Sequence, residues 1–561
     1  MDADVIVVGA GLAGLVAAGE LIAAGKKVAI VDQESEANLG GQGWWSFGGV
    51  FLVDTPEQRR LGVKDSLDLA WQDWQGSAGW DRLGDGNERA EDYWAQKWGR
   101  AYVEWAAGEK RDWLRGKGIR FTPMVGWAER GDGRATGHGN SVPRFHICWG
   151  TGTGAVKPFV EGALAAAEQG LVTFYHRHQV DEVMTEGGAV TGVRGTVLAP
   201  DSSERGAQSN RDKAGEFELK AQAVVIATGG IGGNHDLVRE FWPERLGQPP
   251  REMITGVPAY VDGRGIGIAN EAGARLVNRD RMWHYVEGIQ NWAPVWPKHA
   301  IRILPGPSPL WFDALGRLLP APYLPGYDTL GTLKYLRTTP DIKQYDHSWF
   351  IVTQKMIEKE FALSGSEQNP DITNRDLKLL VKTRAGKGAP PPVEAFKKNG
   401  ADFVVAERLS DLVVKMNALT EEPLLDAAEV ERQIVARDRE FANPFSKDAQ
   451  TWGIHNARRY RGDKLTRVSS PHRVLDPKAG PLIGVKLHVL TRKSLGGIQT
   501  NLDSQALASD GTPIAGLYAA GEAAGFGGGG VHGFNSLEGT FLGGCFFSGR
   551  AAGRAIARQL A

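Results

Sequence analysis

Three glycines near the N-terminus have the spacing that dinucleotide binding requires. Gly9, Gly11 and Gly14 follow the apolar run Val5–Val8 and precede an alanine-rich segment. The first glycine permits a tight turn, the second lets the backbone approach a pyrophosphate, and the third lets a helix pack closely on a strand. The phosphates would then lie at the positive end of that helix. Asp32 closes the next apolar run, where a carboxylate accepts hydrogen bonds from a ribose. We expect cofactor contacts from Gly9, Gly11, Leu12, Ala13, Gly14, Asp32 and Gln33.

Further glycine-containing segments favour FAD over a nicotinamide cofactor. They are Gly40-Gly41-Gln42, Ser46–Gly49, Ala227–Gly230 and Gly516–Glu522. With these segments the chain resembles the fumarate reductase/succinate dehydrogenase flavoprotein superfamily, whose members include 3-ketosteroid dehydrogenases. The resemblance implies FAD contacts from Gly41, Gln42, Gly48, Gly49, Ala227, Thr228, Gly229, Gly521 and Glu522.

The resemblance also implies how FAD is attached. In the covalent members of the superfamily a histidine precedes the Ala-x-Gly-Gly segment, and Gln42 stands at that place here. An amide cannot form the covalent bond, so we expect noncovalent FAD. The resemblance further implies that a last helix, from about Ser536 to Leu560, points its N-terminus at the flavin. Backbone N–H groups of Ser536 and Leu537 would then stabilise negative charge on the reduced ring.

The elements around these motifs indicate an α/β fold. Val5–Val8 and Val28–Val31 are apolar runs typical of strands buried on both faces, and Leu15–Ala24 between them is helical. One such βαβ unit predicts a parallel sheet. Ala223–Ala227 and Gly516–Ala520 are further strands, so both chain ends are expected to build one domain. We predict a Rossmann-like FAD-binding domain of the GR2 type from 1–280 and 481–561, with an inserted α+β capping domain at 281–480.

Four residues are candidates for catalysis: His284, Tyr285, Lys493 and His532. His284 lies within one residue of the place of a substrate-binding histidine in fumarate reductases, and Tyr285 could donate to a carbonyl. Lys493 could polarise a substrate oxygen or the flavin. His532 lies in a glycine-rich loop that the resemblance puts near the flavin. The alternative for each is a packed structural side chain or a surface charge.

The expected substrate is apolar. Fumarate reductases hold two carboxylates with cationic side chains, and three of those positions fall on Leu318, Ser536 and Lys493, although Arg317 and Arg492 lie nearby. The segment after residue 281 is rich in aromatic residues, which either line a cleft for a flat molecule or form the core of the cap. They are Trp283, Tyr285, Trp292, Trp296, Trp311, Phe312, Tyr323 and Tyr327.

These observations predict an FAD-dependent oxidoreductase that forms or reduces a C=C bond next to a carbonyl in an apolar, steroid-like substrate. The resemblance implies that hydride passes to or from flavin N5. One alternative is a dicarboxylate oxidoreductase of the fumarate/succinate type, which needs two cations facing the flavin. Another is a flavin-binding protein without turnover, which the missing family cations make conceivable.

Composition limits the other classes. Lys and Arg number 65 against 66 Asp and Glu, which argues against a general nucleic-acid or anionic-membrane footprint. Two cysteines, Cys148 and Cys545, cannot make a disulfide scaffold, and no motif suggests a metal. The N-terminal apolar stretch is short and lacks a basic leader, which predicts a cytoplasmic protein without a transmembrane segment. The electron acceptor and the oligomeric state stay open.

Overall fold

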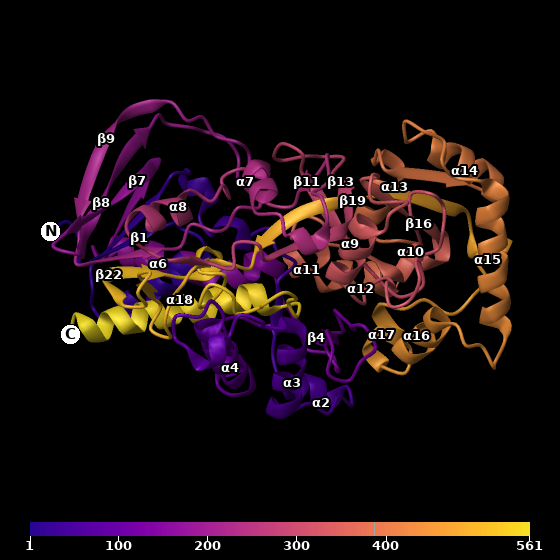
Figure 1. Cartoon of the computed structure of the whole chain (residues 1–561), viewed down its shortest axis with the longest axis horizontal. Coiled ribbons are helices and arrows are strands. Elements are labelled where there is room, and N and C mark those ends of the chain that lie inside the picture. The colour runs from indigo at the N-terminus through magenta and orange to yellow at the C-terminus, as the bar shows by residue number, and fades with distance from the viewer. Residues whose placement is uncertain (386–387) are drawn as a thin grey trace.

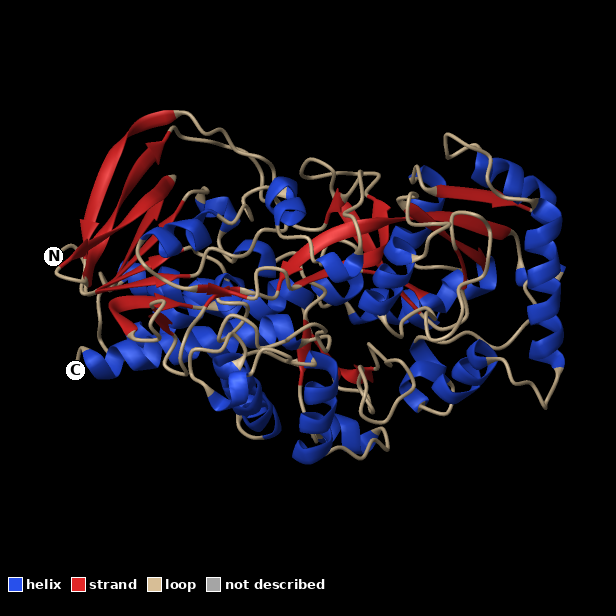
Figure 2. Cartoon of the chain, in the orientation of Figure 1, coloured by secondary structure: helices blue, strands red, loops and turns tan. Residues whose placement is uncertain are grey.

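The computed structural model describes residues 1–385 and 388–561 as two β-sheets, each covered by helices. The chain ends lie at the same end of the molecule, and the second sheet lies toward the other end (Figures 1 and 2). The sheet near the termini has the order β6-β2-β1-β10-β22-β8-β7, with β21 on β22 and β9 on β8. Its strands are β1 (Val5–Val8), β2 (Val28–Asp32), β6 (Val172–His176), β7 (His178–Glu186), β8 (Ala189–Leu198), β9 (Lys213–Lys220), β10 (Ala223–Ile226), β21 (Gln505–Leu507) and β22 (Pro513–Ala519).

The centre of the first sheet is parallel and fully buried. All four residues of β1 and all four of β10 are buried, as their unbroken apolar runs predict. Val5 pairs in parallel with Val28 of β2 and with Ala223 of β10, and β10 pairs in parallel with β22. Strands from both ends of the chain therefore share one sheet, and the predicted α/β class is confirmed.

The second sheet is mainly antiparallel, in the order β15-β16-β19-β13-β14-β17, with β11 and β18 also paired to β19. Its long strand β19 pairs with β13 on one side and β16 on the other. The division of the chain at 280 and 480 stays a prediction, and this pairing puts residues 482–494 in the second sheet. The strands are β11 (Ile254–Thr255), β13 (Met282–Gln290), β14 (Ala300–Pro305), β15 (Leu310–Phe312), β16 (His347–Thr353), β17 (Phe361–Leu363), β18 (Phe403–Ala406) and β19 (Leu482–Ser494).

Two smaller sheets and the helices complete the fold. The smaller sheets are β3 (Gly49–Phe51), β4 (Phe121–Gly126) and β5 (Phe145–Cys148), and β12 (Leu276–Val277) with β20 (Gly497–Ile498). The helices of the first half are α1 (Leu12–Ala23), α2 (Pro56–Arg60), α3 (Leu67–Ala78), α4 (Tyr93–Ala107), α5 (Lys110–Gly116), α6 (Thr151–Glu168), α7 (His235–Glu240) and α8 (Arg264–Glu271). Those of the second half are α9 (Thr329–Thr338), α10 (Gln354–Glu360), α11 (Pro370–Thr373), α12 (Leu377–Ala385), α13 (Pro391–Asn399), α14 (Leu409–Asn417), α15 (Ala427–Ala442), α16 (Ala449–Ala457), α17 (Arg461–Thr466) and α18 (Thr540–Gln559).

The first and last helices bring the two chain ends together. Helix α1 packs against α18, and glycines of α18 make this contact close. A Cβ on Gly549 would lie 2.4 Å from the backbone oxygen of Ala13, and one on Gly553 would lie 2.6 Å from that of Ala17. Among the residues that the structure describes, no helix combines the length and apolarity needed to cross a bilayer.

Candidate active site

A deep cavity lies between the two sheets. Its open space, counted to include the mouth that is open to solvent, is about 1700 Å³. Its walls include the carboxyl ends of β1, β2 and β10, at Val8, Asp32 and Ala227. Ligands of open α/β sheets bind at this edge. Tyr285 of β13 and Arg302 of β14 close the other end.

Glycines build the first part of the cavity wall. Gly9 has a φ of +104°, and a Cβ there would lie 2.6 Å from the backbone oxygen of Ala227. A Cβ on Gly14 would lie 2.2 Å from the backbone oxygen of Gly9, so Gly14 sets the distance between helix and strand and does not itself line the cavity. A Cβ on Gly11 would be 3.9 Å from its nearest protein neighbour, so this backbone faces open space at the start of α1.

The Asp32 carboxylate lies in the wall of this cavity and is held there by backbone groups. It accepts hydrogen bonds from the backbone N–H groups of Ala10 (2.7 Å) and Glu34 (2.8 Å). Burial raises the pKa of Asp32 to about 6, although these two hydrogen bonds oppose the rise. The side chain lines the cavity next to Gln33, as a ribose-binding carboxylate would.

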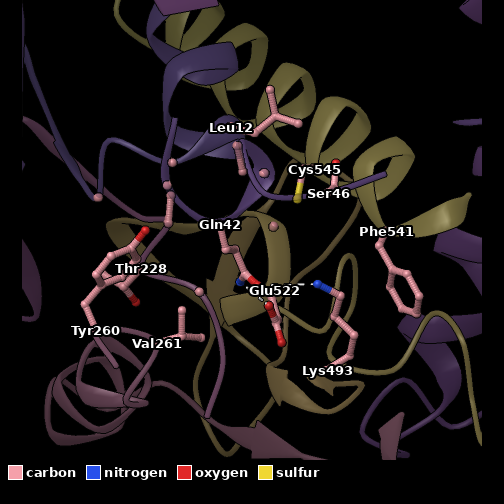
Figure 3. A pocket seen from close by; sticks show the side chains of 18 of the residues that line it. Leu12, Gln42, Ser46, Thr228, Tyr260, Val261, Lys493, Glu522, Phe541 and Cys545 are labelled. Atoms are coloured by element: carbon pink, nitrogen blue, oxygen red, sulfur yellow. Dashed lines mark hydrogen bonds between the residues drawn. The ribbon is translucent and has the colours of Figure 1, made fainter. Parts of the chain in front are cut away.

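Gln42, Glu522 and Lys493 meet across the middle of the cavity (Figure 3). The Gln42 amide donates to Glu522 Oε2 (2.5 Å), and Lys493 Nζ donates to Gln42 Oε1 (3.3 Å). The other Glu522 oxygen accepts from the backbone N–H of Ser494 (2.8 Å). Burial lowers the pKa of Lys493 to about 8. Its ammonium also lies 5.5 Å from the centre of the Phe541 ring.

These walls fit an FAD molecule. Gly11 offers open backbone at a helix N-terminus for phosphates. Thr228 Oγ1 and Ser46 Oγ are buried in the wall without a hydrogen-bond partner among the described residues, so both have donors and acceptors free for a ligand. His178 is the only histidine that lines the cavity within residues 1–385 and 388–561. Gln42, at the place of the flavin-linking histidine, is occupied by its amide hydrogen bonds.

Tyr285, Glu538 and Arg302 form the charged end of the cavity. Tyr285 Oη donates to Glu538 Oε1 (2.9 Å), and Arg302 Nη1 donates to the same oxygen (2.7 Å). The Arg302 guanidinium also lies 3.8 Å from the centre of the Tyr285 ring. Burial raises the pKa of Tyr285 well above its ordinary value, and the Glu538 charge adds to the rise. Tyr285 is therefore a neutral O–H donor at physiological pH.

Further titratable groups lie behind Arg302, outside the cavity wall. Glu287 Oε2 is 3.4 Å from Arg302 Nε, and Glu129 Oε1 is 3.4 Å from Nη2. Burial raises the pKa of both carboxyls. His138 lies 3.6 Å from Glu129, and neither of its ring nitrogens has a hydrogen-bond partner among the described residues. Burial alone would lower the pKa of His138, but the neighbouring carboxylates of Glu129 and Asp328 raise it.

Two of the predicted catalytic residues lie outside the cavity wall. His284 alternates with Tyr285 on β13 and faces the other way, where its ring stacks on Trp242. Its Nδ1 accepts a hydrogen bond from the backbone N–H of Arg492 (3.0 Å). His532 packs against the rings of Trp74, Phe526 and Phe541. Burial lowers the pKa of each histidine to about 3, so both are neutral.

The start of the last helix also differs from the prediction. Helix α18 begins at Thr540, after Gly539 with a φ of +89°. Ser536 and Leu537 are buried in the preceding turn and do not line the cavity, whereas Glu538 and Gly539 do. The helix thus begins four residues later than predicted, and Glu538, just before the left-handed Gly539, pairs with Arg302.

Three of the eight aromatic residues that were expected to line a cleft belong instead to the core around the second sheet. Of that set only Tyr285 lines the cavity, while Trp283, Trp311 and Phe312 are buried and Trp292 is exposed. The apolar wall is instead supplied by other segments: Phe47, Phe145, Leu304, Phe526, Phe541 and Leu542. Successive side chains of a strand point to opposite faces of the sheet. Composition alone therefore could not identify which aromatic residues line the cavity.

The sequence also missed Arg302 and Glu538, which are 236 positions apart in the chain and joined only by folding. Arg492 and Lys493 both line the cavity. Arg317, the other cation near a family position, is outside the wall and pairs with Asp313 and Asp341. An arginine inside the apolar run Ala300–Pro305 was the available signal for Arg302, because such a residue is rarely buried without a partner.

The fold and this cavity define a flavoprotein. Residues 4–542 match the family model described as FAD binding domain, and the chain belongs to that family. It is 59% identical over its full length to KsdD-like steroid dehydrogenases of Mycobacterium tuberculosis and Mycolicibacterium smegmatis, covering 96% and 100% of those proteins. Among solved structures it resembles the 3-ketosteroid Δ1-dehydrogenase of Sterolibacterium denitrificans in complex with 1,4-androstadiene-3,17-dione, with a TM-score of 0.67, 15% identity and 99% of each chain covered.

These similarities confirm three predictions. The chain is an FAD-dependent oxidoreductase, its cofactor is FAD, and its fold is that of the flavoprotein superfamily named from the motifs. The individual roles of the site residues, the domain boundaries and the cytoplasmic location stay predictions.

Proposed function

We propose that the chain is an FAD-dependent dehydrogenase that forms or reduces a C=C bond next to a carbonyl in an apolar, steroid-like substrate. The observation that carries this proposal is the Tyr285–Glu538–Arg302 arrangement at the end of a cavity whose remaining wall is largely apolar and glycine-rich. The names of the relatives at 59% identity, and the steroid bound in the similar solved structure, support the substrate class.

In the cofactor half, backbone groups and two carboxylates would hold FAD. Gly9, Gly11 and the start of α1 would hold the pyrophosphate, Asp32 the ribose, and Glu522 the ribityl arm. Bound FAD supplies the acceptor or donor of hydride. Oxidation of the substrate also releases a proton from the carbon next to the carbonyl, and that proton requires a group of the protein.

Tyr285 is the proposed acid/base. As Tyr285 Oη takes the proton from the substrate carbon, it passes its own proton along the 2.9 Å hydrogen bond to Glu538. Arg302 holds the receiving carboxylate in place and balances its charge until the transfer. In the direction of reduction the same groups return the proton. Because Tyr285 is neutral at rest, it can act only through such a paired transfer.

Arg492 and Lys493 are proposed to polarise the substrate carbonyl. Both line the cavity, and cationic donors stabilise the negative charge that develops on such an oxygen. His284 positions Arg492 through its hydrogen bond to the Arg492 backbone. This assignment gives His284 a supporting role, and it gives His532 a packing role.

The same two cations favour a second candidate, a dicarboxylate reductase, because two carboxylates require two fixed cationic partners. The two candidates differ in substrate charge. The apolar rings of Phe526 and Phe541 in the same wall suit a carboxylate poorly.

The test is anaerobic absorbance of the FAD-loaded protein during titration with a 3-ketosteroid, a simpler cyclic ketone and succinate. The proposal expects a ketone to bleach the oxidised-flavin band and to yield an unsaturated ketone as product. Bleaching by succinate alone would establish the dicarboxylate reading. Bleaching by dithionite but by none of the three would overturn both readings and favour a flavin protein without this turnover.

A further inference from the structure

A segment far from the cavity has an uneven charge. Residues 443–467, which we term the basic hairpin, contain helices α16 and α17 and lie at the end of the molecule away from both termini (Figure 1). The basic hairpin has six Lys or Arg and two Asp, whereas the chain as a whole carries a net charge of -1. The neutral total therefore conceals a local positive region.

The fold of the basic hairpin fixes which side chains face outward. Ile454 and Ala457 of α16 pack against Val468 in a small core of their own. Trp452, Asn456 and Arg459 occur at helical spacing and are exposed. They lie on a face of α16 other than the one that carries Ile454 and Ala457.

The loop before α16 is held in place and presents an aromatic ring. Ser446 Oγ donates to Glu440 (2.7 Å) and accepts from the backbone N–H of Asp448 (3.1 Å). Trp452 Nε1 donates to the backbone oxygen of Ser446 (2.6 Å), which ties the loop to the helix. Phe445 at the loop tip is 85% exposed, and Trp452 is 60% exposed. Leu465 of α17 adds a third exposed apolar side chain.

Four exposed cations accompany these apolar side chains: Lys447, Arg459, Arg461 and Lys464. None of the four has an ion-pair or hydrogen-bond partner for its side chain among the described residues. Some exposed arginines elsewhere in the described chain pair with carboxylates, as Arg408 does with Asp411. The only acids of the hairpin are Asp448, which caps α16, and Asp463, which is buried in an ion pair with Arg130.

We propose that the basic hairpin docks the protein onto the surface of an anionic lipid bilayer. Phe445, Trp452 and Leu465 would enter the interface between head groups and acyl chains, as exposed aromatic and aliphatic side chains of peripheral proteins do. The four unpaired cations would lie against anionic head groups, which attract each nearby Lys or Arg. Charge complementarity selects an anionic bilayer over a neutral one. The proposal does not depend on the substrate assigned above, although a bilayer would also hold an apolar substrate.

The test measures sedimentation of the purified, FAD-loaded protein with phosphatidylcholine vesicles, with or without about one third phosphatidylserine. We expect the protein to sediment with the anionic vesicles only. Raising the ionic strength should release it, because the Debye length shrinks to about 3 Å at 1 M salt.

Two variants separate the contribution of the four cations to vesicle binding from that of the exposed aromatic rings. Changing the four cations to Glu should lower anionic-vesicle binding by about fivefold per charge, and by at least about fiftyfold together. The variant Phe445→Ser with Trp452→Ser should lower it at least about tenfold. The apolar control is Val414→Ser on α14, which is exposed but outside the hairpin. The charge control reverses the same number of charges, with Lys-to-Glu changes at four exposed positions outside the hairpin: Lys64, Lys117, Lys334 and Lys343.

Every variant is first checked for an unchanged flavin spectrum and melting temperature, so that loss of binding is not loss of fold. Equal binding to neutral and anionic vesicles, or no binding to either, would overturn the proposal. So would an equal loss of binding in the charge control, which would mean that only net charge matters. Dimerisation through Phe445 and Trp452, or binding to nucleic acid without binding to vesicles, would assign the hairpin to a different partner.

Discussion

The two ends of the cavity differ in the groups that form their walls. At the FAD end much of the wall is glycine backbone that packs closely on neighbouring segments, with the Asp32 side chain beside it. At the charged end the wall is side chains, and Tyr285, Arg302 and Glu538 meet there from distant segments. Closely packed glycine backbone tolerates few added atoms, and Asp32 is the titratable side chain beside it. A side-chain wall tolerates conservative changes in shape and depends on charge balance.

The most complete loss of cofactor is therefore expected from the smallest substitution at the FAD end. Gly14→Ala would put a methyl group 2.2 Å from the backbone oxygen of Gly9. We expect purified protein without bound flavin, destabilised by about 1–3 kcal/mol in urea unfolding. The matched control is Gly19→Ala in the same helix, where nothing lies within 4 Å of the new atom. That variant should keep its flavin, and loss of flavin in both would refute the backbone account.

The charged end should respond most to loss of its central cation. Arg302→Met leaves Glu129, Glu287 and Glu538 without a shared partner. Breaking a buried pair in this way costs about 3–5 kcal/mol. Burial already raises the pKa of Glu129 and Glu287, and removal of the arginine raises both further.

This change also has a defined pH dependence. The folded variant binds more protons than the unfolded chain above the ordinary Glu pKa, so its deficit should shrink as pH falls from 8 toward 5. Urea unfolding of wild type, Arg302→Met and Arg302→Lys across that range measures the effect. Arg302→Lys keeps a charge and should lose less. A deficit of Arg302→Met that is constant with pH would contradict the proposed charge balance.

Variants of Arg492 and Arg317 should differ in turnover. Arg492→Gln removes a cavity-lining donor and should lower the rate of flavin reduction by at least about tenfold. Arg317→Gln changes an exposed residue outside the wall that pairs with Asp313 and Asp341. It should leave turnover unchanged and shift stability by no more than about 0.5 kcal/mol. The opposite ranking would move the substrate site toward Arg317.

The smallest expected effect is a pH dependence of FAD affinity. Asp32 has a pKa of about 6 in the folded protein because it is buried. Its ionised form accepts ribose hydrogen bonds, so FAD affinity should fall as pH drops through 6 and the carboxylate takes up a proton. Fluorescence of released FAD measures this affinity. In Asp32→Asn the affinity should be lower and independent of pH over this range, and a wild-type curve that is flat through pH 6 would exclude Asp32 from binding.

The same contrast explains what the sequence could predict. The fold class and the FAD segments follow from local patterns, because Gly9, Gly11 and Asp32 lie within one βαβ unit. Backbone walls require glycine at fixed spacing, so their composition indicates their function. Ser536 and Leu537 precede α18, which begins only at Thr540 after the left-handed Gly539, and their contact with FAD stays a prediction.

The charged end of the cavity could not be predicted from local sequence patterns. His284 and Tyr285 are adjacent in sequence, yet strand alternation turns only Tyr285 toward the cavity. The pairing of Arg302 with Glu538 depends on the register of β13, β14 and β19 and on the turn before α18. No local pattern encodes a contact between residues so far apart in the chain. Side-chain sites of this kind are specified only by the complete fold.

The central claim is that Tyr285 moves the proton while the backbone cradle only holds FAD. It is tested most directly by rapid-mixing absorbance of FAD-loaded wild type and Tyr285→Phe with a 3-ketosteroid under anaerobic conditions. Removing a general acid/base slows a step by about 10²–10⁴-fold. We therefore predict that the variant binds FAD as tightly as wild type but that its flavin is reduced at least about 100-fold more slowly. Flavin reduction at the wild-type rate in Tyr285→Phe would contradict the claim.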